Sequence, residues 1–151
     1  MSNSTPISAG SQTPCCPYTQ VGGIVYFPRM LSKIRFKNEG TLHPDFHEKM
    51  GNAFDAVCCR FLGIDYCALK ERVLSGGSDE EVLQWVFSQS KKPSDEQIQI
   101  WNSYMLKRGW RDEESGATKR LEEFKAASGL AHRSDILTFF DYFEVDEKRK
   151  P

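Results

Sequence analysis

The sequence contains no long hydrophobic run. A helix that crosses a membrane needs about 20 consecutive apolar residues, and polar residues interrupt every apolar stretch of this 151-residue chain well before that length. The N-terminus also lacks the basic region and apolar core of a secretory signal. We therefore expect a cytoplasmic protein that does not associate with membranes.

The sequence also lacks an excess of charge of either sign. Its 20 Lys and Arg residues are balanced by 21 Asp and Glu residues, which gives a formal net charge of -1. Nucleic acids attract proteins that carry a strong positive field, and a balanced chain does not produce one. We expect no nucleic-acid partner.

The sequence also lacks an even number of cysteines, because it has five. Four of them form two vicinal pairs, Cys15-Cys16 and Cys58-Cys59. A secreted protein built on a disulfide framework would leave one thiol over. Reduced thiols are the simpler interpretation.

The common catalytic and nucleotide-binding motifs are absent. There is no Walker-type loop, no dinucleotide-binding glycine pattern and no Gly-x-Ser-x-Gly turn around a nucleophile. These absences exclude the usual nucleotide sites and the hydrolase elbow. We predict no cofactor.

The composition that is present fits one globular domain. Hydrophobic residues make up 39% and aromatic residues 12% of the chain, which is enough to build a single core. Residues 1–20 are rich in Ser, Thr, Pro and Gly without any period, and they predict a disordered or extended tail. The predicted helical domain covers residues 21–146, and a charged tail covers 147–151.

Apolar residues recur at helical spacing in seven segments. The fold class that we predict is all-α, a compact single-domain bundle of about seven short helices without a fixed repeat. The short stretch GGIVYF, residues 22–27, has strand character, but no second strand is expected to pair with it. The expected helices cover 28–39, 43–62, 65–74, a segment after Ser78, a segment after Ser94, 113–127, and a segment from Ser134 that buries Ile136 and Leu137.

Two helix starts carry a capping-box pattern, in which a Ser is followed three residues later by Glu or Gln. Ser78 precedes Glu81, and Ser94 precedes Gln97. In this arrangement the two side chains satisfy amides of the first turn that have no partner within the helix. Both starts are therefore expected where these serines lie.

Several motifs together resemble a family. The stretches GGIVYFPRMLSKIR, FLGID, SDEEVLQWV, IQIWNSYM and DILTFFDYFEVDE are similar to a bacterial family of domains of unknown function, DUF5069. The resemblance covers about residues 17–149. It implies a compact, mainly helical domain of bacterial origin, and it brings no settled activity and no catalytic residues.

The stretch GGIVYFPRMLSKIRFK contains the first candidate site. Arg29, Lys33 and Lys37 are four residues apart and form one stripe on the predicted helix. A helix start that follows two glycines and a proline can bind an anion through its free amides, and Arg29 lies beside that start. The alternative, which we favour, is a basic face exposed to solvent.

The second candidate lies in FDAVCCRFLG. Asp55 and Cys59 are one turn apart on the same side of a helix, whereas Cys58 lies on its apolar face. A thiol near a cation can ionise, but a nearby carboxylate such as Asp55 raises its pKa. Buried structural cysteine is the favoured interpretation.

Two weaker candidates complete the set. His43 and His47 are four residues apart and could bind a metal, but Pro44 biases His43 away from helical geometry and no further ligands follow at a metal-site spacing. We predict no metal. Trp110 follows Gly109, and either it anchors a partner or it covers the core, which we favour.

Two hypotheses of function follow. The first is a non-catalytic module that binds a protein partner or a small anionic ligand. The second is a small enzyme or enzyme accessory with a pocket between the Arg29/Lys33 helix and the Asp55/Cys59 helix. In that pocket Arg29 and Lys33 would hold an anion beside Asp55 or Cys59. The sequence leaves the oligomeric state open.

Overall fold

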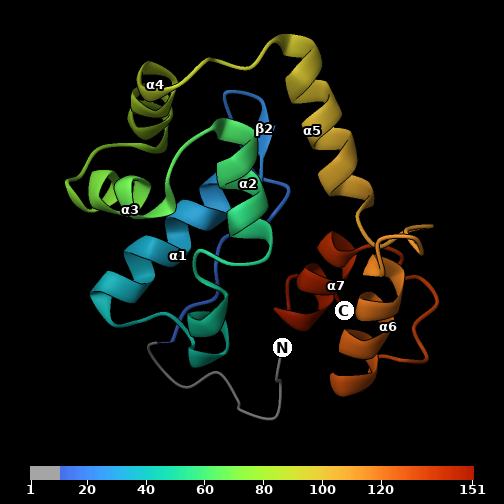
Figure 1. Cartoon of the computed structure of the whole chain (residues 1–151). Helices are drawn as coiled ribbons and strands as arrows, with labels where there is room; N and C mark the ends of the chain where they lie inside the picture. Colours follow the sequence, from blue (N-terminus) through green and yellow to red (C-terminus); the bar gives the residue numbers. More distant parts are fainter. Residues whose placement is uncertain (1–10) are drawn as a thin grey trace.

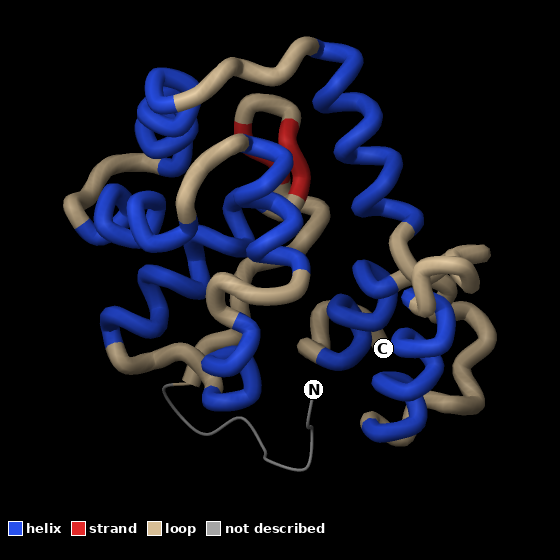
Figure 2. The backbone as a smooth tube through the Cα atoms, viewed as in Figure 1, coloured by secondary structure: helices blue, strands red, loops and turns tan. Residues whose placement is uncertain are grey.

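Seven α-helices, one 3₁₀ helix and two short strands form within residues 11–151, which are the residues that the computed structural model describes (Figures 1 and 2). The prediction of a compact, single-domain, all-α fold is confirmed. The elements are β1 (Gln20–Val21), β2 (Ile24–Val25), α1 (Phe27–Glu39), the 3₁₀ helix η1 (Pro44–Lys49), α2 (Phe54–Leu62), α3 (Tyr66–Leu74), α4 (Asp79–Gln89), α5 (Asp95–Lys107), α6 (Ala117–Ala127) and α7 (Phe139–Asp146).

The helices gather in two groups that α5 connects. Helices α1 to α4 and the two strands lie on one side, and α6 and α7 lie together on the other (Figure 1). Helix α5 packs against β2 at one end and α7 at the other. None of the helices in residues 11–151 has both the length and the apolar character that a membrane crossing requires.

Helix α1 lies at the centre of the core. Its first eight residues, from Phe27 to Ile34, are all buried, the polar ones included. Pro28 occupies the first turn, where a missing amide costs nothing, and Gly40 ends the helix in a left-handed conformation. Because neighbouring elements cover every side of these two turns, even a charged side chain on them must find a partner inside the protein.

The two strands form a hairpin, so the expectation that residues 24–25 would have no pairing partner is wrong. β1 and β2 pair antiparallel, with Val21 opposite Ile24. Gly22 and Gly23 connect them with φ angles of 58° and 77°, which suits a two-residue hairpin turn. The partner strand is only two residues long, too short for an alternating pattern to show in the sequence.

The predicted single helix over 43–62 is also wrong, because the chain breaks between η1 and α2. Gly51 has a φ of 75° and Ala53 a φ of 50°, neither of which fits a right-handed helix. The Gly51 amide donates to the Asp55 carboxylate instead of to a helix carbonyl. The Tyr66 ring lies 2.9 Å from where a Cβ of residue 51 would be, so this position favours glycine.

Helix starts follow their caps. Ser78 and Ser94 both form complete capping boxes, as predicted. The last helix, in contrast, begins after Thr138, whose side chain accepts from the amide of Asp141, and not at Ser134. Leu137 therefore precedes the helix, and its side chain, predicted to be buried, is 52% exposed.

Residues 11–19 run along the helical body. Gln12 forms a parallel bridge with Leu42, the amide of Cys15 donates to Ser32 Oγ at 3.0 Å, and the amide of Tyr26 donates to the carbonyl of Pro17. The prediction for residues 1–10 lies outside the described residues.

Candidate functional site

A pocket of about 440 Å³ opens between the two helical groups. Its walls come from α1, η1 and α2 on one side and from α6 and α7 on the other. Pockets that bind small molecules have volumes of about 300–1,000 Å³ and occur where packed elements meet. This pocket has both properties.

Much of the wall is aromatic. The Phe54 ring meets the rings of Phe139 and Phe143 edge to face, with centroids 5.5 and 6.0 Å apart. Phe124 meets Phe139 in the same way at 5.7 Å. Edge-to-face pairs at these distances are favourable beyond their buried area. The result is a rigid apolar surface that suits the body of a ligand.

All the charged residues that line the pocket are cationic. Neither Asp nor Glu is among the described residues of the wall. The buried end of the pocket carries two of the cations, and the half-buried and exposed residues nearer the solvent carry the others. These side chains are Arg29, Lys33, Lys49, Arg60, Arg108 and Arg120.

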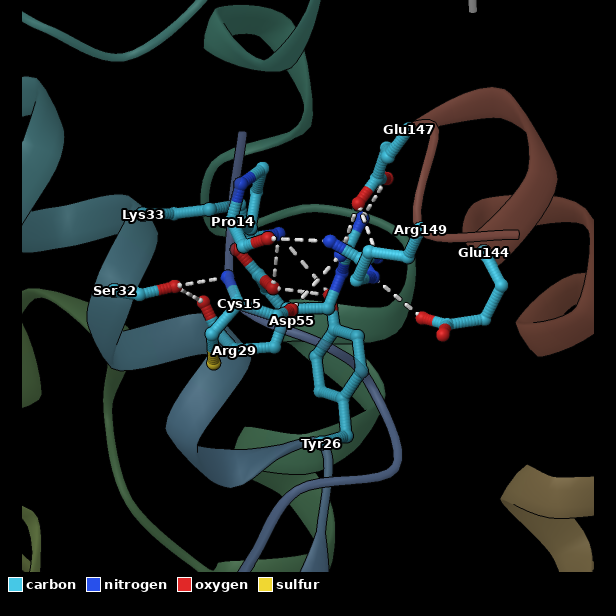
Figure 3. A network of polar contacts seen from close by, with 10 residues as sticks. All are labelled: Pro14, Cys15, Tyr26, Arg29, Ser32, Lys33, Asp55, Glu144, Glu147 and Arg149. Carbon is cyan, nitrogen blue, oxygen red and sulfur yellow. Dashed lines mark hydrogen bonds and ion pairs between the residues drawn. The ribbon is translucent and has the colours of Figure 1, made fainter. Parts of the chain in front are cut away.

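Lys33 belongs to a buried cluster with Tyr26 and Asp55. Its Nζ lies 2.6 Å from Asp55 Oδ1 and 3.0 Å from the Tyr26 hydroxyl oxygen. The Tyr26 hydroxyl donates to the same carboxylate oxygen at 2.6 Å. Tyr26 and Lys33 are seven residues apart, two turns of α1, so both face the start of α2. Figure 3 shows the three side chains converging.

Burial changes the acidity of this cluster. Desolvation lowers the pKa of Lys33, although the Asp55 carboxylate opposes that change. Desolvation and the charge of Asp55 raise the pKa of Tyr26 well above its usual value. Tyr26 therefore stays a neutral hydrogen-bond donor, and Lys33 loses its proton more readily than an exposed lysine does.

Arg29 forms a second buried cluster beside the first. Its guanidinium donates to both carboxylate oxygens of Glu147, at 2.8 and 2.6 Å, and to the carbonyl of Cys15 at 3.1 Å. It also lies 4.5 Å from the centre of the Phe143 ring. Burial alone would lower the pKa of Arg29, but the Glu147 carboxylate raises it. Arg149 also pairs with Glu147, at 2.5 Å (Figure 3).

The profile of the family described as Domain of unknown function (DUF5069) matches residues 11–149. The chain belongs to this family. The family membership that the sequence motifs indicated is thus confirmed, while the bacterial origin stays a prediction. The DUF5069 domain contains the whole pocket and both buried clusters. A search of curated proteins found no match to the chain.

The structure of this DUF5069 domain corrects the prediction of a solvent-exposed basic stripe. Arg29 is 2% and Lys33 is 3% exposed, whereas Lys37, one turn further on, is exposed. The physical reason is that the C-terminal turn covers Arg29 and α2 covers Lys33, and both provide carboxylates. The spacing of residues within one helix does not reveal carboxylates that distant segments of the chain place beside it.

The other predicted site residues of the DUF5069 domain divide into two groups. Asp55 does not line the pocket itself, but it contacts Lys33, which does. Cys59 does not line the pocket, because its Sγ lies 3.9 Å from Met30 Sδ in the core. Burial, with a smaller effect from Asp55, raises the pKa of Cys59 to about 12, so its thiol stays protonated. Cys58 is buried in the core, as favoured.

The histidines and Trp110 lie outside the pocket. His43 Nδ1 accepts from the Asp45 amide, and His47 Nε2 contacts the Leu42 carbonyl at 3.0 Å. Within residues 11–151, no three metal-binding side chains come together. The expectation that Trp110 covers the core is wrong: its side chain is 45% exposed, and the Arg111 guanidinium lies over its ring.

Sequence reasoning missed the cations of the pocket mouth, Lys49, Arg60 and Arg120. Only Arg60 carries a usable signal, because it lies three residues after Val57 and so shares a helix face with another residue of the wall. Lys49 and Arg120 come from separate elements of the DUF5069 domain, and no spacing in the sequence relates them.

Proposed function

We propose that the pocket binds a small anion with an aromatic or other apolar body. The observation that carries this proposal is a set of cations without counter-ions above an aromatic wall. Arg29, Lys33 and Arg108 each pair with a carboxylate. Among residues 11–151, no carboxylate pairs with Lys49, Arg60 or Arg120.

The positions of these three cations support the same ligand class. Lys49 Nζ lies 5.7 Å from the centre of the Phe124 ring, so it reaches from η1 toward α6 at the pocket. Arg60 and Arg120 are exposed, and each keeps guanidinium donors that suit a carboxylate or phosphate. An anionic group would bind at this mouth, where it stays partly hydrated, while the apolar body enters among the phenylalanines.

The cation set and the volume favour a small molecule over a macromolecule. A nucleic acid would need basic residues spread over an extended surface, and the chain as a whole is nearly neutral. Here three cations without a carboxylate partner in residues 11–151 line one pocket of about 440 Å³. That arrangement suits one ligand with a single anionic group.

Calorimetric titration with phenyl phosphate tests the proposal. We expect it to bind, and we expect inorganic phosphate and benzyl alcohol to bind at least about tenfold more weakly, because each retains only half of the interaction. Arg120→Ala should raise the dissociation constant of phenyl phosphate by about tenfold, the value of one lost charge-assisted contact.

Lys119→Ala is the matched control, since Lys119 precedes Arg120 on α6, is exposed and does not line the pocket. It should leave the dissociation constant unchanged. Equal effects of the two substitutions would mean that only the overall charge attracts the ligand, and the proposal would then be wrong. Equal affinity for phenyl phosphate and inorganic phosphate would contradict the role of the aromatic wall.

A further inference from the structure

We propose that Lys33 forms a Schiff base with an anionic aldehyde or ketone that binds in this pocket. The inference rests on the proposed function, because the ligand must enter the same pocket, and it adds the chemical group that the ligand carries at its inner end. Lys33 would then form a covalent bond with the ligand, in addition to its ion pair with Asp55.

The position of the amine is the first argument. Lys33 lines the pocket from its buried end, and its Nζ contacts two partners among the described residues, Tyr26 and Asp55. A protonated lysine carries three N–H groups, so one remains for a group in the pocket. An oxygen atom of the ligand that reaches this depth would accept that hydrogen bond. Its carbonyl carbon would then lie next to Nζ.

The neighbouring carboxylate is the second argument. A lysine attacks a carbonyl only as the neutral amine, and enzymes favour that form by desolvation or by a neighbouring cation, while a base accepts the proton that is released. Asp55 Oδ1, at 2.6 Å, can accept the proton from Lys33 Nζ. The charge of Asp55 favours the ammonium form, but burial outweighs it, so the pKa of Lys33 is lowered overall. Lys49, the other lysine of the wall, is only half-buried and lies over an aromatic ring without a carboxylate partner in residues 11–151.

The backbone of Tyr26 is the third argument. This residue has a φ of 74°, in the left-handed region that a bulky side chain rarely adopts. A strained residue of this kind persists only where the surrounding structure holds it, and such residues concentrate at functional sites. The strained conformation belongs to the residue whose hydroxyl contacts both Lys33 and Asp55.

The proposed step balances without an oxidant or reductant. Asp55 takes a proton from Lys33, and the nitrogen lone pair forms a C–N bond while the carbonyl π electrons move to oxygen. That oxygen receives one proton from the attacking nitrogen and a second from Asp55, with the Tyr26 hydroxyl in position to relay it. The C–O bond breaks, water leaves and a protonated imine remains. Overall, an ammonium group and a carbonyl give an iminium ion and one water.

Reductive trapping tests the inference. The probe is 4-carboxybenzaldehyde, which combines an aromatic body, a carboxylate and an aldehyde, and sodium cyanoborohydride reduces the imine to a stable amine. Intact mass should show one carboxybenzyl group per chain, and peptide mapping should place it on Lys33. We expect Lys33 to be labelled at least about tenfold faster than any exposed lysine, because an activated lysine reacts ahead of ordinary ones.

Lys33→Arg is the first control, because it keeps a cation beside Asp55 and so preserves the buried pair. It should abolish the rapid phase of labelling while leaving the circular dichroism spectrum unchanged. Phenyl phosphate, which has no carbonyl, should slow the labelling of Lys33 by competing for the pocket. Lys119→Arg should change nothing.

The outcomes separate this inference from the proposed function. If phenyl phosphate binds but Lys33 is labelled no faster than exposed lysines, the inference is wrong and the anion site stands. If phenyl phosphate does not bind and Lys33 is not labelled, both are wrong. Rapid labelling of Lys33 that phenyl phosphate does not slow would mean that the amine is reactive but not within an anion pocket, which also overturns the inference as stated.

Discussion

Asp55→Ala is expected to lower the free energy of unfolding by about 3–5 kcal/mol, the usual result of removing one partner from a buried ion pair. Three donors lose their acceptor at once: Lys33 Nζ, the Tyr26 hydroxyl and the Gly51 amide. Lys33 Nζ and the Tyr26 hydroxyl are buried in the folded protein and the Gly51 amide is partly buried, whereas all three are solvated in the unfolded chain. Urea denaturation followed by tryptophan fluorescence measures the change.

The matched control is Asp135→Ala, which removes a carboxylate from an exposed pair with Arg133. Exposed pairs contribute little, so this variant should unfold at nearly the same urea concentration as the parent protein. Asp55→Asn, which keeps the shape and part of the acceptor capacity, should fall between the two. If Asp55→Ala cost no more than Asp135→Ala, Lys33 would be solvated and the buried cluster would not exist.

Glu147→Ala is expected to destabilise the protein by about 3 kcal/mol or more, because it leaves the Arg29 guanidinium buried without its carboxylate. Arg149 loses the same partner, but it keeps Glu144 at 2.6 Å and is partly exposed. Glu122→Ala is the control, because the Glu122 side chain is 55% exposed in its pair with Lys125. Thermal and urea unfolding should both separate the two variants.

A paired replacement isolates the cause of this loss. In the double variant Arg29→Met and Glu147→Leu, no unpaired charge remains, and apolar pairs often replace buried ion pairs without cost. We therefore expect the double variant to be more stable than Glu147→Ala alone. If it were equally unstable or worse, the loss would come from packing around Phe143 and not from the unpaired arginine.

The fold was largely predictable because most of its signals are local. Ser78 and Ser94 start helices through side chains that act within one turn, and Gly40 ends one through its own backbone freedom. The wrong prediction of one helix over 43–62 has a cause that lies elsewhere in the chain. The break at Gly51 depends on the ring of Tyr66, which packs where a side chain would otherwise stand.

The candidate site was only partly predictable for the same reason. Arg29, Lys33 and Asp55 were identified as candidates, but Glu147, the partner of Arg29, lies 118 positions away along the chain. A pattern of apolar residues indicates which face of a helix packs against the core. It does not indicate whether other segments of the chain also cover the polar face. The aromatic wall combines residues of α2, α6 and α7, which come together only in the folded protein.

The contacts around Arg29 join both ends of the folded region. Arg149 donates to the carbonyl of Pro14, 135 positions away, and Arg29 connects Cys15 to Glu147. Closing so long a loop costs chain entropy before these contacts can repay it, so they are expected to form after the local helices and after the transition state for folding. Contacts of that kind leave the folding rate almost unchanged and slow unfolding. These contacts between the two ends of the domain therefore determine mainly the lifetime of the folded state and have little effect on the folding rate.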